Sequence, residues 1–161
     1  MFLSRDEVEK RIEGMLKSGK SRKKIARLLK DKVEHGKLLF YLNNIPNPED
    51  KARYLILNMF LSGLLAFVTA RKVALAFSFG GFDIYTLMAL VVPVINIYIF
   101  MEISRFRRIG YQFLAVLSVL SLINPENHHV PEVVILPIMA GISAFLYFKM
   151  FPKRQLLREI P

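Results

Sequence analysis

The stretch IYTLMALVVPVINIYIFMEISRFRR, residues 84–108, decides the fold of this chain. Its first 18 residues, Ile84–Met101, contain no charged side chain, and arginines follow at positions 105, 107 and 108. At about 1.5 Å per residue, a helix of that length approaches the roughly 30 Å hydrocarbon thickness of a bilayer. Arginines directly after an apolar run are typical of the cytoplasmic end of a membrane span. The sequence therefore predicts an integral membrane protein.

The remaining apolar residues also occur in long blocks. The chain has 161 residues, 53% of them hydrophobic, and a mean hydropathy of +0.36. Such blocks favour membrane spans over the periodic pattern of a water-soluble core. We expect an all-α protein with four transmembrane helices, at about 54–70, 84–103, 106–123 and 133–151, within a bundle covering 47–152. The apolar segment 73–82 is too short to cross, so it should lie at the membrane surface or re-enter it.

The positive charges predict the orientation of the spans. With four spans, 21 of the 23 lysines and arginines fall on one side, including those of the basic tail 153–161. Arg71 and Lys72 alone fall on the other side. Because short loops rich in Lys and Arg stay in the cytoplasm, both termini should be cytoplasmic. The expected location is the cytoplasmic (inner) membrane, as a multi-pass protein.

Residues 1–46 carry a different pattern, that of short amphipathic helices. One apolar stripe runs through Val8, Ile12, Met15 and Leu16, and a second through Ile25, Leu28, Leu29 and Val33. Gly19 is a plausible stop for the first helix, and Ser21 a plausible N-cap for the second. The sequence thus predicts a two-helix hairpin, whose helices either pack together or lie on the membrane.

This N-terminal region is strongly basic. Residues 1–53 hold fourteen Lys and Arg against eight Asp and Glu, a net charge of +6. The basic residues expected to contact anionic lipid or a cytoplasmic partner are Arg22, Lys23, Lys24 and Arg27.

A helix-turn-helix DNA reader is the competing interpretation of the same region. Ser21 followed by Ile25-Ala26 has the spacing found where the first helices of such proteins meet. A DNA reader also needs a separate recognition helix after a second turn. Leu28–Leu42 has no turn signal beyond Gly36, so nucleic acid is not an expected partner.

Six polar residues lie in the half of the spans nearest the arginines: Tyr98, Tyr111 and a set of four with amide or carboxyl side chains, Asn58, Asn96, Glu102 and Gln112. Polar groups in hydrocarbon are costly unless they are paired, so these side chains should face the bundle interior. In one interpretation, Asn58 and Asn96 form hydrogen bonds between helices and Glu102 pairs with Arg105 or Arg53. In the other, the four residues line a polar vestibule.

Small residues at four-residue spacing suggest where helices approach closely. Such faces are Ser62, Ala66 and Ala70, beside Gly63, and Ala140 and Ala144, beside Gly141. The contact could lie within one chain or between subunits.

Motifs for chemistry are weak. His128 and His129 lie near Glu126 and Glu132, and this set is a weak candidate for Zn²⁺. Adjacent histidines rarely share one metal on regular structure, and the spacing matches no metal motif. The chain has no Cys and no G-x-S-x-G sequence. We therefore expect no metal, no cofactor and no enzymatic activity.

These observations predict a small non-catalytic membrane protein acting as an interaction, assembly or regulatory module. Its expected partners are membrane lipids, mainly anionic, and a cytoplasmic protein, and it could form homo-oligomers or join a larger membrane complex. The alternative is a transporter or channel subunit that works as an oligomer with a polar vestibule on the cytoplasmic side. A membrane enzyme acting at the outer loop is the third hypothesis.

Overall fold

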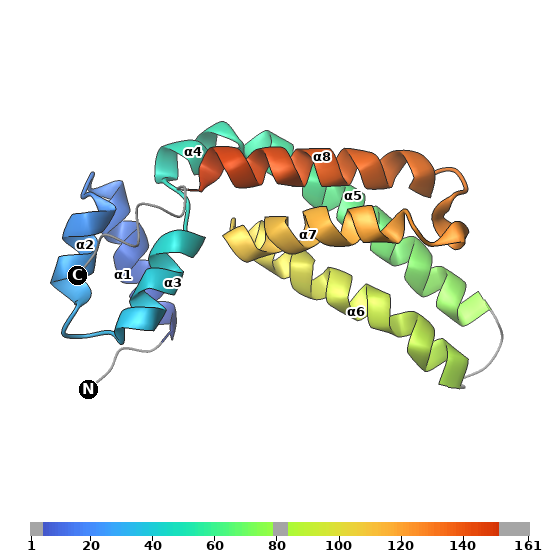
Figure 1. The fold of residues 1–161 in the computed structure, drawn as a ribbon, viewed down its shortest axis with the longest axis horizontal. Helices are drawn as coiled ribbons and strands as arrows, with labels where there is room; N and C mark the ends of the chain where they lie inside the picture. The colour runs from blue at the N-terminus through green and yellow to red at the C-terminus, as the bar shows by residue number, and fades with distance from the viewer. Residues whose placement is uncertain (1–4, 79–83, 152–161) are drawn as a thin grey trace. The chain divides into compact units, whose positions relative to one another are not determined.

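The computed structural model describes residues 5–78 and 84–151, and all regular structure within them is helical (Figure 1). The α-helices are α1 (Arg5–Lys17), α2 (Arg22–Leu29), α3 (His35–Asn44), α4 (Pro48–Arg53), α5 (Leu55–Ser78), α6 (Ile84–Ser104), α7 (Arg108–Ser121) and α8 (Glu132–Met150). A 3-10 turn, η1 (Pro125–Asn127), precedes α8. The prediction of an all-α chain is confirmed. The basic tail 153–161 lies outside the described residues.

The chain divides into two compact units. Of the described residues, the N-terminal unit contains 5–53 and 148–151, and the apolar unit spans Tyr54–Tyr147. Each unit has its own kind of surface.

The start of the N-terminal unit follows the local signals in its sequence. Helix α1 ends where Gly19 takes a φ of +73°, a left-handed conformation that glycine adopts at little cost. The amide of Lys20 donates to the carbonyl of Met15 and that of Gly19 to Leu16, which satisfies the last carbonyls of α1. Ser21 then caps α2, its hydroxyl accepting a hydrogen bond from the backbone amide of Lys24 at 3.3 Å. The predicted stop and cap are therefore both present.

The expected two-helix hairpin is replaced by three packed helices. Helix α2 ends at Leu29, a turn follows, and α3 begins at His35, so the chain does not continue as one helix to Leu42. The buried core draws on all three helices and the turn: Val8, Ile12, Leu16, Ile25, Ala26, Leu29, Val33, Leu38, Tyr41, Leu42 and Ile45. The physical reason is burial, because the chain must reverse after Leu29 for the α3 side chains to reach this core.

The apolar unit contains the helices that could cross a membrane. By length and composition, three described helices qualify: α5 with 24 residues, α6 with 21 and α8 with 19. Helix α7 is also apolar but has only 14 residues, about 21 Å at the usual rise per residue. Three apolar helices of sufficient length are thus present, and the span expected at 106–123 corresponds to the shorter helix α7.

Helix α5 extends further than expected. It was expected to end near Ala70, yet it continues without a break through Arg71 and Lys72 to Ser78. Residues 73–78 are thus the last turns of this helix and not a separate segment, while 79–82 lie outside the described residues. Two cations now lie inside a long apolar helix, where each needs a partner.

Successive helices of the apolar unit run in opposite directions, as the colour order in Figure 1 shows. The first residues of α5 meet the last of α8, since the rings of Tyr54 and Phe145 lie 5.9 Å apart, edge to face. We call this the arginine end, because it also holds Arg105 and Arg107 between α6 and α7, and Arg108 at the start of α7. The opposite end, which holds residues 124–131 between α7 and α8, is the loop end.

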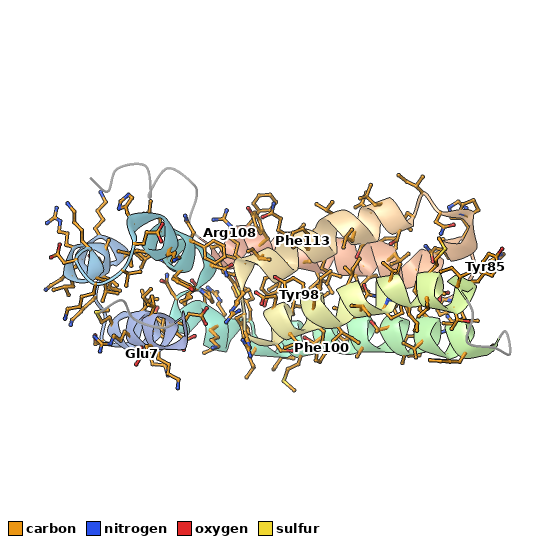
Figure 2. The ribbon with its side chains drawn as sticks, turned by 90° about the horizontal axis from the view of Figure 1, so that it is seen from below. Glu7, Tyr85, Tyr98, Phe100, Arg108 and Phe113 are labelled. Carbon is orange, nitrogen blue, oxygen red and sulfur yellow. The ribbon has the colours of Figure 1, made fainter. Side chains whose placement is uncertain are left out.

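Large apolar side chains cover the outside of these helices. Tyr85 and Tyr98 on α6 and Phe113 on α7, labelled in Figure 2, are all exposed. On the first small-residue face, Ala66 and Ala70 are exposed, so it is not a close contact within this chain. The glycines beside the two faces also have room, because a Cβ added at Gly63 or Gly141 would meet nothing within 4 Å. Close approach occurs instead at Gly110, where a Cβ would lie 2.9 Å from the Cβ of Glu102. Glycine at this position therefore allows α7 to pack tightly against the end of α6.

Candidate functional site

The basic surface of the N-terminal unit lies on α2. Ile25, Ala26 and Leu29 on one side of this helix are buried in the core, while Lys23, Lys24 and Arg27 on the other side are exposed. The apolar contacts that fix the orientation of α2 therefore also fix which way its cations face. The structure brings together three of the four basic residues expected to bind a partner.

Arg22, the fourth expected residue, has a structural role. Its guanidinium donates to the backbone carbonyl of Leu42, to that of Ile45 at 2.8 Å and to Oδ1 of Asn47 at 3.1 Å. The last carbonyls of a helix have no partner within the helix and carry a partial negative charge, which a cation neutralises well. Arg22 thus caps the end of α3, and the basic surface consists of Lys23, Lys24 and Arg27.

One cation of this unit is neutralised by a neighbour. Nζ of Lys37 lies 2.9 Å from Oε2 of Glu34, one turn earlier. This hydrogen bond, together with the attraction between the two charges, raises the pKa of Lys37 above its ordinary value. Lys37 therefore offers a natural comparison for the cations of α2.

A second polar group occupies the arginine end of the apolar unit. Asn58 on α5 is buried, donates to the carbonyl of Ile103 at 3.2 Å and accepts a hydrogen bond from the Tyr111 hydroxyl at 2.5 Å. These bonds tie α5 to both α6 and α7. The interpretation of Asn58 as a hydrogen-bonding contact between helices agrees with this placement.

Glu102 forms the charged part of the same end. Its Oε1 accepts a hydrogen bond from Nη1 of Arg107 at 2.9 Å, and both side chains are almost fully buried. The prediction that Glu102 pairs with Arg105 or Arg53 is therefore wrong. The turn explains the choice: Phe106 takes a φ of +55°, and the amide of Arg107 donates to the carbonyl of Glu102, which places the two side chains together.

The other two residues of the expected vestibule lie elsewhere. Asn96 is half-buried in the middle of α6, and Gln112 is exposed on α7 although its neighbour Tyr111 is fully buried. The structure brings Asn58 and Glu102 to the arginine end but does not bring Gln112 to them. Tyr111 and Arg107 complete this polar group. Tyr111 was among the polar residues expected to face the interior, whereas no local sequence signal distinguished Arg107 from the other arginines of its loop.

Arg108 joins α7 to α8 at the same end. Its Nη2 donates to the Tyr147 hydroxyl at 2.8 Å, and the centre of its guanidinium lies 4.7 Å from the centroid of that ring. A cation over an aromatic face is attracted by the ring's negative face. Arg108 therefore connects α7 to α8, in addition to contributing to the positive charge of the arginine end.

The loop end contains a third polar group. Arg71 pairs with Glu132 at 2.8 Å, and the Glu132 side chain is only 9% exposed. Lys72 donates to Oδ1 of Asn127 at 3.0 Å, and Asn127 in turn donates to the carbonyl of Ser121 at 2.7 Å. These contacts connect α5 to the loop that leads into α8.

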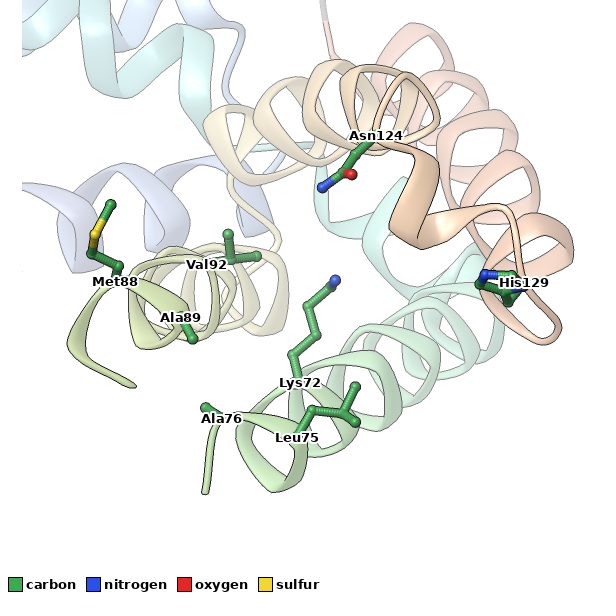
Figure 3. Close-up of a pocket in the computed structure, with 8 residues that line it drawn as sticks. All are labelled: Lys72, Leu75, Ala76, Met88, Ala89, Val92, Asn124 and His129. Carbon is green, nitrogen blue, oxygen red and sulfur yellow. The ribbon is translucent and has the colours of Figure 1, made fainter. Parts of the chain in front are cut away.

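His128 and His129, in the loop before α8, lie in different surroundings. Nε2 of His128 lies 2.7 Å from the carbonyl of Leu122, to which it donates when that nitrogen carries the proton. His129 lines a cavity beside Lys72 (Figure 3). Among the described residues, no three His, Asp or Glu side chains gather as a metal ion would require.

No family model matches the chain, and neither a curated protein nor a solved structure shows significant similarity to it.

Proposed function

We propose that this protein is a non-catalytic membrane protein whose basic N-terminal unit contacts an acidic surface on the cytoplasmic side of the membrane. The surface in question is anionic lipid or an acidic protein partner. The observation that carries the proposal is the division of α2 into a buried face and a basic face, with Lys24 and Arg27 exposed on a packed, net-positive unit. Cations held on a preformed helix bind an anionic surface without first ordering the chain.

The proposed topology has four spans with both termini in the cytoplasm. Its support is the meeting of Tyr54 and Phe145, which puts the start of α5 and the end of α8 at one end of the apolar unit. That geometry supports an even number of crossings, in which the short helix α7 also crosses. The bias of Lys and Arg toward the same end favours a cytoplasmic location for it.

A membrane location for the apolar unit is supported by its surface. Helices α5, α6 and α8 bury less than a third of their most apolar 18-residue windows inside the chain. Water-soluble proteins rarely leave such continuous apolar faces uncovered, whereas lipid covers them at no cost. We infer that these faces contact lipid or a second membrane protein, including another copy of this chain.

The transporter or channel alternative has less support. Asn58 is already hydrogen-bonded to two partners, and Gln112 is exposed away from that group. A vestibule formed by these residues would require them to face a common space. The polar group at the arginine end is better explained as the contact that holds three helices together.

The proposal is tested with the full chain reconstituted in nanodiscs of neutral lipid. Binding of the nanodiscs to vesicles containing phosphatidylglycerol is measured by flotation at low and high salt. Binding should fall in Lys24→Gln/Arg27→Gln by about 2 kcal/mol, at roughly 1 kcal/mol per cation near an anionic surface. Lys37→Gln is the matched control, since the Lys37 charge is already paired with Glu34.

Three outcomes would contradict the lipid form of the proposal. These are equal binding to neutral vesicles, insensitivity to salt, and unchanged binding in the double variant. The separate helix α3 removes the objection that residues 28–42 lack a turn, so duplex DNA is included as a competitor. If DNA displaces the vesicles at equal charge concentration, the partner of the basic surface is nucleic acid and not lipid.

A further inference from the structure

Lys72 is a cation inside an apolar helix. It lies inside α5, which continues for six more residues to Ser78, and its side chain is half-buried. Its neighbour Arg71 has a carboxylate partner in Glu132, but Nζ of Lys72 is bonded to the neutral amide of Asn127. Among the described residues, no carboxylate pairs with Lys72. A cation at this depth in an apolar helix is costly unless an anion approaches it.

A cavity of about 590 Å³ opens beside this lysine. Most of its wall is apolar and comes from the facing sides of α5 and α6: Leu75, Ala76, Met88, Ala89 and Val92. Figure 3 shows the Lys72 side chain extending from α5 toward the space between α6 and Asn124. The volume falls within the roughly 300–1,000 Å³ typical of small-molecule sites.

The described part of the polar rim carries positive charge. It is formed by Lys72, Asn124 and His129, and among the residues that the structure describes, no acidic side chain lines the cavity. A site with an apolar wall and a cationic rim is complementary to an amphiphile that has an anionic head. Because α5 and α6 are long and apolar enough to cross a membrane, the amphiphile at hand is a membrane lipid.

We propose that this cavity binds a phospholipid with an anionic headgroup. The lipid phosphate pairs with Lys72 at the polar rim, and one acyl chain lies along the wall between Leu75 and Val92. The phosphate supplies the counter-charge that Asn127 cannot, and the chain fills the space that the two helices leave open. This site lies at the loop end of the apolar unit and is independent of the basic surface on α2.

The test uses the full chain in nanodiscs with a phosphatidylglycerol that carries a diazirine in its acyl chain. After photolysis, labelling at Val92 is compared by peptide mapping with labelling at Val94, which is exposed on the same helix but does not line the cavity. The ratio removes the background expected of any lipid-facing residue. We expect the ratio to fall about fivefold in Lys72→Gln, the ordinary effect of one lysine on an anionic lipid.

Two further variants separate binding from folding. Lys72→Arg keeps the charge and should keep the ratio near that of the native chain. Ala89→Phe fills the cavity without touching the charge and should lower the ratio even if Lys72→Gln fails to fold. An unchanged ratio in Lys72→Gln and Ala89→Phe, or an equal ratio with a phosphatidylcholine probe, would overturn the proposal.

Discussion

The Tyr111 hydroxyl donates a 2.5 Å hydrogen bond to Oδ1 of Asn58, a residue 53 positions earlier in the chain. Through the second bond of Asn58, to the carbonyl of Ile103, this contact links α7 to α5 and α6 at one point. Both side chains are buried, so neither can exchange its partner for water. The strength of this link is the first property that can be measured.

Tyr111→Phe should destabilise the chain because it leaves Oδ1 of Asn58 buried without its donor. The expected loss is about 1–3 kcal/mol, the usual cost of an unsatisfied buried polar group, measured by thermal unfolding of the full chain in detergent. Tyr98→Phe is the control, because Tyr98 is half exposed. An equal loss of stability in Tyr98→Phe would show that the cost does not come from the unpaired amide of Asn58.

Gly110→Ala should prevent the close packing of α7 on α6. The new Cβ would lie 2.9 Å from the Cβ of Glu102 and from the backbone nitrogen of Ile103, and backbone cannot move aside cheaply. Overpacking of this kind costs about 1–3 kcal/mol. Gly141→Ala, which meets nothing within 4 Å, is the matched control and should gain about 0.5–1 kcal/mol from helix propensity. Equal effects of the two substitutions would contradict the close approach.

Glu102→Gln should cost more than either change above. It removes the carboxylate that neutralises Arg107 and leaves a buried cation, at an expected cost of about 3–5 kcal/mol. Arg105→Gln changes an exposed residue of the same loop and should have little effect. Denaturation in detergent compares the two variants, and a similar stability for both would show that Arg107 finds another partner.

Arg22→Gln should weaken folding of the N-terminal unit, whereas Lys24→Gln should weaken only its binding to an anionic surface. Arg22 donates to carbonyls at the end of α3, and hydrogen bonds from a charged group contribute about 1.5–3 kcal/mol. Hydrogen exchange of the α3 amides in the full chain should therefore accelerate in Arg22→Gln alone. Acceleration in both variants would indicate a general effect of charge.

The proposed topology can be read from single cysteines, because the chain has none of its own. A cysteine at Asn124, at the loop end, should react with an impermeant maleimide added outside intact cells. A cysteine at Arg105 should react only after the cells are opened. The reverse pattern would place the basic residues outside the cell. If both cysteines react from outside, α7 does not cross the membrane and the number of crossings is not even.

Much of the architecture could be predicted from short stretches of sequence. Gly19 and Ser21 act on backbone groups within a few residues, so the end of α1 and the start of α2 were both predicted correctly. The turn before His35 was missed, because Gly36 is the sole local signal there and burial of Val33 and Leu38 determines the reversal. The capping role of Arg22 was missed for the same reason, since its partners lie 20 or more positions away.

The candidate site residues divide in the same way. Polar residues in apolar helices were recognised as needing partners, but the partners themselves could not be named. Glu102 was paired with the wrong arginine because the left-handed turn at Phe106 decides which side chain reaches it. Lys72 was taken as the end of a span, and its position inside α5 became visible only with the helix complete.

By itself, the sequence determined the helical class, the long apolar helices, the caps and the distribution of charge. Each depends on side-chain transfer energies or on hydrogen bonds within one turn, which act wherever the residue lies. The tertiary structure decided the third helix of the N-terminal unit, the Asn58–Tyr111 and Glu102–Arg107 pairs, and the cavity at Lys72. Those features depend on which helix faces align, because a buried polar group takes whichever partner the packing brings within reach.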